Sequence, residues 1–188
     1  VLVSLIGAVV LLGHYFDWPT VTAVLPGAVD MMPLTALSFV VAGAIGELLD
    51  HRELDVFRDA GVFALGVFIS VSMLLVLVSF GVIAVPWGAP RVNMAVGEGI
   101  PSIGTAAGFL CFSVGAWQLL RARDATAWGV AMCGIAGTAF FGYVIDAPAL
   151  YFYSPEFSTA MAIHTALCTG LMGIEVVRRS SAINGGAP

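Results

Sequence analysis

The feature that most constrains this chain is a largely apolar segment that runs from Ser158 to Val177 and ends on two arginines, Arg178 and Arg179. A helix needs roughly 20 apolar residues to cross the hydrocarbon core of a bilayer, and this segment has that length. Similar apolar segments recur along the chain. In lipid every backbone polar group must be paired within the protein, so only helices and closed barrels can span a membrane.

The composition favours helices in lipid. Hydrophobic residues make up 60% of the chain and charged residues 10%, with a mean hydropathy of +1.00. A soluble domain is usually about half apolar and about a quarter charged. Membrane β-strands read as segments of about ten residues that alternate apolar and polar positions, whereas the apolar segments here are continuous and longer. We therefore predict an all-α, polytopic membrane helical bundle.

Charge and special residues exclude several classes of function. The net charge is −5, with seven arginines and no lysine, so there is no basic patch for nucleic acid and no amine for a Schiff base. The three cysteines, Cys111, Cys133 and Cys168, lie inside apolar segments and are interpreted as packing residues. The motifs GxSxG and HExxH and the P-loop are absent. We expect a protein that is not an enzyme, and we predict no cofactor.

Six transmembrane helices, paired as three helical hairpins, are predicted within a domain over 1–179, followed by a short cytoplasmic tail over 180–188. Proline, glycine and charged residues separate the apolar segments. Because the chain opens on apolar residues from Val1, the first segment is interpreted as a truncated helix. The predicted segments are 1–16, 31–49, 60–85, 99–120, 126–145 and 158–177.

The arginines predict the orientation. Short loops that are rich in arginine stay on the cytoplasmic side of a membrane. In this arrangement Arg91 alone falls on the other side, so both termini are expected to face the cytoplasm from a bacterial inner membrane. The six topology-setting arginines are Arg52, Arg58, Arg121, Arg123, Arg178 and Arg179. The opposite loops are acidic and aromatic, with Asp17, Asp30, Glu98, Asp146, Glu156, Trp18, Trp87, Tyr151 and Tyr153.

A Thr-Ala pair marks the start of the second, fourth and sixth predicted helices. These pairs are Thr35-Ala36, Thr105-Ala106 and Thr165-Ala166, and Gly43 and Gly173 each follow their threonine by eight residues. The spacing of the pairs corresponds to one helical hairpin each, which predicts a threefold repeat. Chance recurrence in a chain rich in Gly, Ala and Thr is the alternative.

These helix starts carry a resemblance to a known family. The sequence Met31-Met32-Pro33-Leu34-Thr35-Ala36-Leu37 and the later Met161-Ala162-Ile163-His164-Thr165-Ala166-Leu167 resemble paired motifs in the six-helix N-terminal membrane sensor modules of bacterial histidine kinases and diguanylate cyclases. The loop from Gly142 to Tyr151 is similar to the Gly-Tyr…Pro-x-Leu-Tyr loop that precedes the second motif. The resemblance covers about residues 10–179 and implies a sensor or input domain in signal transduction, followed by an output region.

The chain departs from that family after Arg179, where only nine residues follow and no helical linker is expected. A stand-alone relative would instead be an accessory or structural subunit of a larger membrane complex. We therefore expect partners among membrane lipid and other membrane protein chains or a second copy, and no nucleic acid.

Histidine and carboxylate positions give the candidate sites. His14 and His164 fall near the same end of their helices, as two haem ligands would, but they are more simply interpreted as interhelical hydrogen-bonding residues. His51 lies in a charged loop. No carboxylate lies near the middle of a predicted span, which argues against a proton-coupled transporter. The best cluster for a ligand or partner comprises Asp146, Tyr151, Tyr153, Glu156 and His164.

Overall fold

The computed structural model describes residues 2–23, 29–49, 59–69, 71, 101–151 and 160–185. Over these residues the chain is helical and contains no strand, which confirms the all-α prediction. The helices are α1 (Leu2–Tyr15), α2 (Pro19–Thr22), α3 (Pro33–Leu48), α5 (Ile103–Leu120), α6 (Thr126–Val144), the 3-10 helix η2 (Pro148–Leu150) and α7 (Ile163–Asn184). A further short apolar helix spans Asp59–Ile69.

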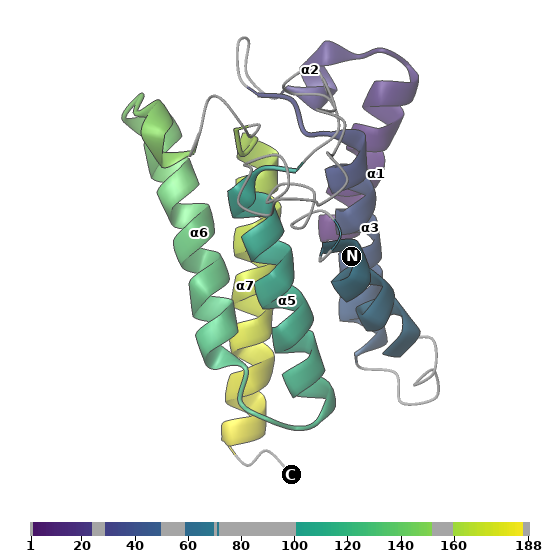
Figure 1. The fold of residues 1–188 in the computed structure, drawn as a ribbon, viewed down its shortest axis with the longest axis vertical. Coiled ribbons are helices and arrows are strands. Elements are labelled where there is room, and N and C mark those ends of the chain that lie inside the picture. Colours follow the sequence, from purple (N-terminus) through teal and green to yellow (C-terminus); the bar gives the residue numbers. More distant parts are fainter. Residues whose placement is uncertain are drawn as a thin grey trace, which may run out of the picture.

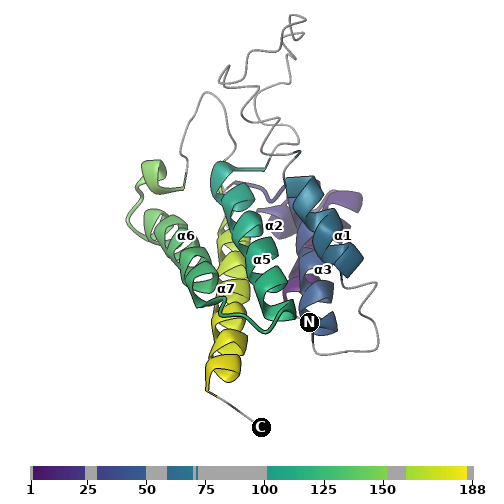
Figure 2. The same ribbon diagram turned by 60° about the horizontal axis from the view of Figure 1, so that its bottom comes forward.

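The long helices lie side by side along the long axis of the molecule (Figures 1 and 2). The helices α3, α5 and α7 begin at one end, called here the entry end, and finish at the opposite exit end. Each of them contacts the other two. The helix α1 packs on α3 and reaches α7, and α6 packs on α7 and α5. In the part of the chain that the structure describes, α3, α5 and α7 are therefore the inner helices, and α1 and α6 pack against them from outside.

The threefold repeat is visible in the backbone of the inner helices. The residues before them, Met32, Ser102 and Ala162, have φ of −62°, −61° and −63° and ψ of 145°, 154° and 152°. Each Thr-Ala pair then occupies the third and fourth helical positions. The threonines are 3%, 3% and 2% exposed. A small, buried first turn lets three helix starts approach one another closely, as the sequence repeat predicts.

The first and last hairpins share a second motif that the sequence analysis missed. Gly13, Asp17 and Pro19 at the end of α1 recur with the same spacing as Gly142, Asp146 and Pro148 at the end of α6. Both aspartates have left-handed backbones, with φ of 54° and 52°, which Asp tolerates better than most residues. The N–H of the following residue donates to the glycine carbonyl at 2.8 Å in both copies. The motif thus turns the chain sharply at the end of each outer helix.

The same two hairpins also pack alike. The Ser4 hydroxyl donates to the Val40 carbonyl at 3.2 Å, and the Cys133 thiol donates to the Gly170 carbonyl at 3.8 Å. A Cβ added at Gly173 would lie 2.8 Å from the Gly129 carbonyl oxygen. Because these helices touch through their backbones, glycine is required where they cross. The hairpins α1–α3 and α6–α7 are therefore copies of one structural unit.

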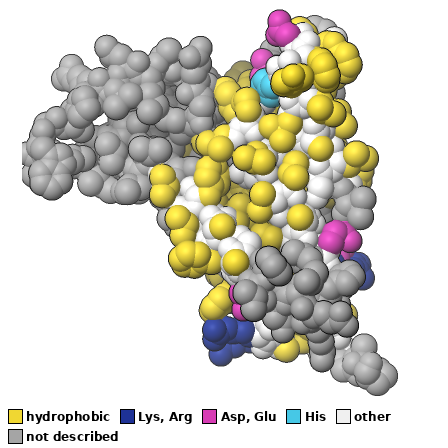
Figure 3. All heavy atoms as spheres, turned by 90° about the vertical axis from the view of Figure 1, so that its right-hand side faces the viewer, with side chains coloured by type: hydrophobic (Ala, Val, Ile, Leu, Met, Phe, Trp, Pro, Cys, Tyr) yellow, Lys and Arg dark blue, Asp and Glu magenta, His cyan; other side chains and the backbone are white. Residues whose placement is uncertain are grey.

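Apolar and charged side chains occupy different parts of the surface along the same axis. Figure 3 shows apolar side chains along one face of the molecule, with histidine and acidic side chains towards one end and basic and acidic side chains towards the other. By length and composition, α5 and α6 are the two described helices that could cross a membrane. The apolar helices Leu2–Tyr15, Pro33–Glu47 and Asp59–Ile69 are shorter. This is compatible with a membrane protein.

The last helix corrects one boundary of the sequence analysis. The predicted sixth helix ended at Val177 and residues from 180 formed a tail without a helical linker, whereas α7 begins at Ile163 and continues to Asn184. The reason is tertiary. Ser180 is fully buried, and its hydroxyl accepts from the Ala125 N–H at 2.8 Å and donates to Asp124 Oδ1 at 2.7 Å. The turn between α5 and α6 therefore holds α7 in helical form beyond the arginines.

Replacing Ser180 with alanine is expected to destabilise the protein by about 1–3 kcal/mol, because the buried Ala125 N–H loses its acceptor. Thermal unfolding in mild detergent measures this change, and Ser181→Ala, on the exposed side of the same turn, is the matched control. Hydrogen bonds from the Ser180 hydroxyl and the Thr126 N–H hold the pKa of Asp124 below its ordinary value of 3.8.

Because the pKa of Asp124 is lowered in the folded state, the contribution of its carboxyl group to the stability of the fold depends on pH. A carboxyl group whose pKa is lower in the folded state stabilises the fold fully above its unfolded pKa, and loses that contribution as the pH falls below it. The difference between the wild type and Asp124→Asn should therefore shrink as the pH falls below about 4. An unchanged difference at low pH would contradict the assigned network.

Candidate functional site

The predicted cluster of Asp146, Tyr151, Tyr153, Glu156 and His164 is only partly within the described residues, because Tyr153 and Glu156 lie outside them. Asp146 is exposed at the end of α6. Tyr151 stacks on Tyr143 with ring centroids 3.9 Å apart and an interplanar angle of 9°. These residues belong to the cap of the third hairpin.

That cap holds the start of α7 through Met161. The Met161 N–H donates to the Tyr151 carbonyl at 2.9 Å, and the Tyr143 hydroxyl donates to the Met161 carbonyl at 2.8 Å. The first hairpin repeats this arrangement. There the Met31 N–H donates to the Thr22 carbonyl at 3.0 Å, and His14 Nε2 lies 2.7 Å from the Met31 carbonyl oxygen. His14 thus occupies the place of Tyr143, in agreement with the interpretation that it forms an interhelical hydrogen bond.

His164 is the exception within the repeat. It is the second residue of α7, where the equivalent residues of α3 and α5 are Leu34 and Gly104. Its side chain is buried, at 5% exposure. Neither ring nitrogen has a hydrogen-bond partner among the described residues. An imidazole in this state is costly, because its polar atoms have left water without gaining partners.

The surroundings of His164 come from the first hairpin. The ring lies close to the backbone of Thr22, outside hydrogen-bonding geometry, and within electrostatic range of Asp30 and His14. The Thr22 hydroxyl donates to Asp30 Oδ1 at 3.0 Å. We therefore place the candidate site at the entry end, where the start of α7 lies near Thr22 and Asp30. The sequence analysis grouped His164 with Asp146 and Tyr151, but no hydrogen bond or ring contact joins it to them among the described residues.

The two histidines of the haem alternative both lie at the entry end, His14 in the last turn of α1 and His164 in the first turn of α7. His14 Nε2 must donate to the Met31 carbonyl, so it would have to give up that bond to coordinate iron. In the part of the chain that is described, no group of three or more His, Cys, Asp or Glu side chains is arranged to hold a metal ion.

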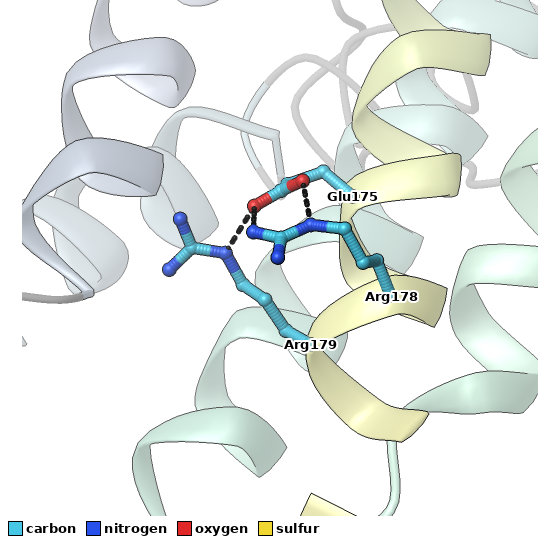
Figure 4. A network of polar contacts seen from close by, with 3 residues as sticks. All are labelled: Glu175, Arg178 and Arg179. Carbon is cyan, nitrogen blue, oxygen red and sulfur yellow. Dashed lines mark hydrogen bonds and ion pairs between the residues drawn. The ribbon is translucent and has the colours of Figure 1, made fainter. Parts of the chain in front are cut away.

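The arginines of the described residues gather at the exit end. Glu175 accepts from both Arg178 and Arg179, with both Arg178 Nη2 and Arg179 Nε 2.6 Å from Glu175 Oε1 (Figure 4). Arg121 lies over the Trp117 ring, 4.2 Å from its centroid. Arg123 is exposed in the turn before α6. Of the other predicted topology residues, Arg52 and Arg58 lie outside the described residues.

His164 and the arginine pair lie on the same helix. The helix α7 carries His164 in its first turn and Arg178 and Arg179 near its last, with no break between them. No protein-family model, curated protein or solved structure matches this chain.

Proposed function

We propose that this chain is the sensor or input domain of a bacterial signalling protein. It would lie in the inner membrane with six transmembrane helices, arranged as three hairpins, and with both termini in the cytoplasm. Support comes from the apolar zone between two polar ends, the repeated hairpins, and the resemblance of the sequences after Met31 and Met161 to such modules. The arginines at the exit end would place that end on the cytoplasmic side.

The observation that carries the proposal is His164, which is buried between two hairpins and whose ring has no hydrogen-bond partner among the described residues. Uncompensated burial of a polar group persists where function requires it. A ligand or partner that supplies a hydrogen-bonding group to the ring, or a proton, would change how α7 sits against the first hairpin. The unbroken helix would carry that change to Asn184 and any output region beyond it.

The test is the variant His164→Leu in the full-length protein. Its leucine fills a similar volume without polar atoms, so the free energy of unfolding should be unchanged or higher, because an unpaired polar group has been removed. The signalling output, read as autophosphorylation or cyclic-dinucleotide synthesis, should stop responding to the stimulus. Leu34→Ala, at the equivalent position of the first hairpin, is the control and should keep the response.

Two results would contradict the sensor proposal. Loss of about 1–3 kcal/mol of stability in His164→Leu would mean that the imidazole is a structural hydrogen-bonding residue. A normal response from a stably folded variant that remains in the membrane fraction would mean that His164 takes no part in sensing.

A second candidate function is an accessory subunit of a membrane complex, and the outer face of α6 favours it. At positions where α1 exposes Leu2 and Leu5, the matching positions of α6 carry Ala131 and Gly134, and a Cβ added at Gly134 meets nothing within 4 Å. Small residues allow another helix to approach closely. Co-purification of a stoichiometric membrane protein, lost in Gly134→Leu, would favour this role over sensing.

A further inference from the structure

The three inner helices start alike, but the N–H groups of their first turns are in different surroundings. The first N–H groups of an α-helix have no acceptor within the helix, so they need water, a capping side chain or a ligand. In α3, Pro33 has no N–H group and Leu34 is exposed. In α5 the first turn is buried, and the Ser102 hydroxyl accepts from the Thr105 N–H at 3.1 Å. The start of α3 is therefore open to water, and the start of α5 is capped.

The first turn of α7 is buried and has no cap. Ala162 occupies the N-cap position that Ser102 occupies in α5, and its methyl group cannot accept a hydrogen bond. Ala162 and Thr165 are each 2% exposed. Among the described residues, no group accepts from the N–H groups of Ile163, His164 and Thr165. These N–H groups have lost water without gaining an acceptor, which is rare for buried backbone.

His164 adds a further donor to this helix start. Side chains of a helix lean towards its N-terminus, so a ring at the second position lies over the open first turn. The residue is 5% exposed, and neither ring nitrogen has a partner among the described residues. A neutral imidazole carries one N–H donor in either tautomer. Backbone and ring donors therefore meet at one buried place where the described residues supply no acceptor in hydrogen-bonding geometry.

The charges around this helix start favour a singly charged anion. The positive end of the helix dipole attracts anions, and N–H groups at helix starts bind carboxylates and phosphates. The arginines that the structure describes gather at the exit end, so none of them balances a second negative charge here. Asp30 lies within electrostatic range of the His164 ring, and it would repel a dianion more strongly than a monoanion.

We propose that the start of α7 binds the carboxylate group of an organic acid. Its oxygens accept from the N–H groups of residues 163–165 and from the His164 ring. A carboxylate has two oxygens with about four lone-pair sites, so one group can serve all of these donors. The inference rests on the proposed sensor function and names the chemistry of its stimulus. Bound acid would give the helix start and the ring the partners that they lack.

NMR of the intact chain in mild detergent, with isotope-labelled histidine, tests the site. The backbone amide of His164 lies within the first turn, and its signal is identified by its loss in His164→Leu. Sodium acetate, added at constant ionic strength, should shift this signal saturably. Inorganic phosphate should bind more weakly than acetate at a pH where it is mostly a dianion. Tighter binding of phosphate would overturn the preference for a single charge.

Ala162→Ser is the most specific variant, because it gives α7 the cap that α5 has. The added hydroxyl would accept from the Thr165 N–H, as Ser102 accepts from Thr105, and would take that donor from the acid. We expect the melting temperature without acid to rise and the affinity for acetate to fall about ten-fold. Ser102→Ala is the matched control. It removes the cap of α5, so it should lower the melting temperature and leave the affinity for acetate unchanged.

The source of the carboxylate has its own arm in the experiment. A shift with both acetate and decanoate assigns the site to a soluble acid, whereas a shift with decanoate alone assigns it to a fatty acid of the bilayer. A saturable shift with neither acid would overturn the site. Equal affinity for acetate in Ala162→Ser and the wild type would overturn the role of the N–H groups.

The ligand and the sensor proposals fail separately. If neither acid binds while His164→Leu still loses its response, only the class of ligand is wrong and the sensor proposal stands. If acetate binds as expected while His164→Leu responds normally, the carboxylate site stands and the sensor role of His164 is wrong.

Discussion

Replacing Gly173 with leucine is expected to destabilise the protein by about 3 kcal/mol or more, because the third hairpin cannot close around a side chain there. A Cβ at this position would lie 2.8 Å from the Gly129 carbonyl oxygen and 2.9 Å from Cys133 Sγ. The obstacle includes backbone, which cannot rotate away, so α6 and α7 must separate. Unfolding in detergent, followed by circular dichroism, measures the loss.

Two further variants make this result specific. Gly134→Leu lies on the open face of α6 and should be neutral or stabilising, because leucine has a higher helix propensity than glycine. Gly43→Leu, the repeat counterpart in α3, would place its side chain against Ser4 and should destabilise as much as Gly173→Leu. If Gly173→Leu were as stable as Gly134→Leu, the close helix crossing would be refuted.

Truncation of either aromatic core residue is expected to have the second large effect. Phe39 and Phe109 are 1% and 2% exposed, and their ring centroids lie 4.8 Å apart between α3 and α5. They follow their threonines by four residues in both repeats. Removing a buried phenylalanine side chain costs about 3–5 kcal/mol through lost burial and the cavity left behind. We expect Phe39→Ala and Phe109→Ala each to fall in that range.

The double variant reports whether the rings act as a pair. An aromatic contact contributes about 0.5–1.5 kcal/mol beyond burial, so the double variant should be less destabilised than the sum of the single ones by about that amount. Phe63→Ala, on the exposed face of the helix Asp59–Ile69, is the control and should change the unfolding free energy little. Strict additivity would show that the first and second hairpins do not meet through these rings.

The repeat could be read from sequence only in part. The Thr-Ala pairs predicted where the three inner helices begin, because small residues at a helix start form a recognisable sequence pattern. The Gly, Asp and Pro residues shared by 13–19 and 142–148 were also present in the sequence. They lie in turns, where few residues are identical between the two copies. Only the left-handed backbones of Asp17 and Asp146 showed that the two turns are the same structure.

The candidate site was the least predictable feature. His164 was identified from its position, but its surroundings were assigned to the loop just before it in sequence. The groups that interact with it electrostatically, Thr22 and Asp30, come from the first hairpin instead. The helices of a hairpin can be predicted from the length of their apolar segments and from the residues of their turns. Contacts between distant hairpins depend on how side chains pack, and they leave no local sequence pattern.

The sequence by itself determined that the chain is helical, because its apolar segments are continuous and longer than the alternating segments of a membrane β-strand. It also determined where the inner helices begin. Only the tertiary structure decided that α7 extends to Asn184, and that His164 is buried with no hydrogen-bond partner for its ring among the described residues. Each of these depends on a neighbour far along the chain: the turn at Ala125 for the end of α7, and Thr22 and Asp30 for the surroundings of His164.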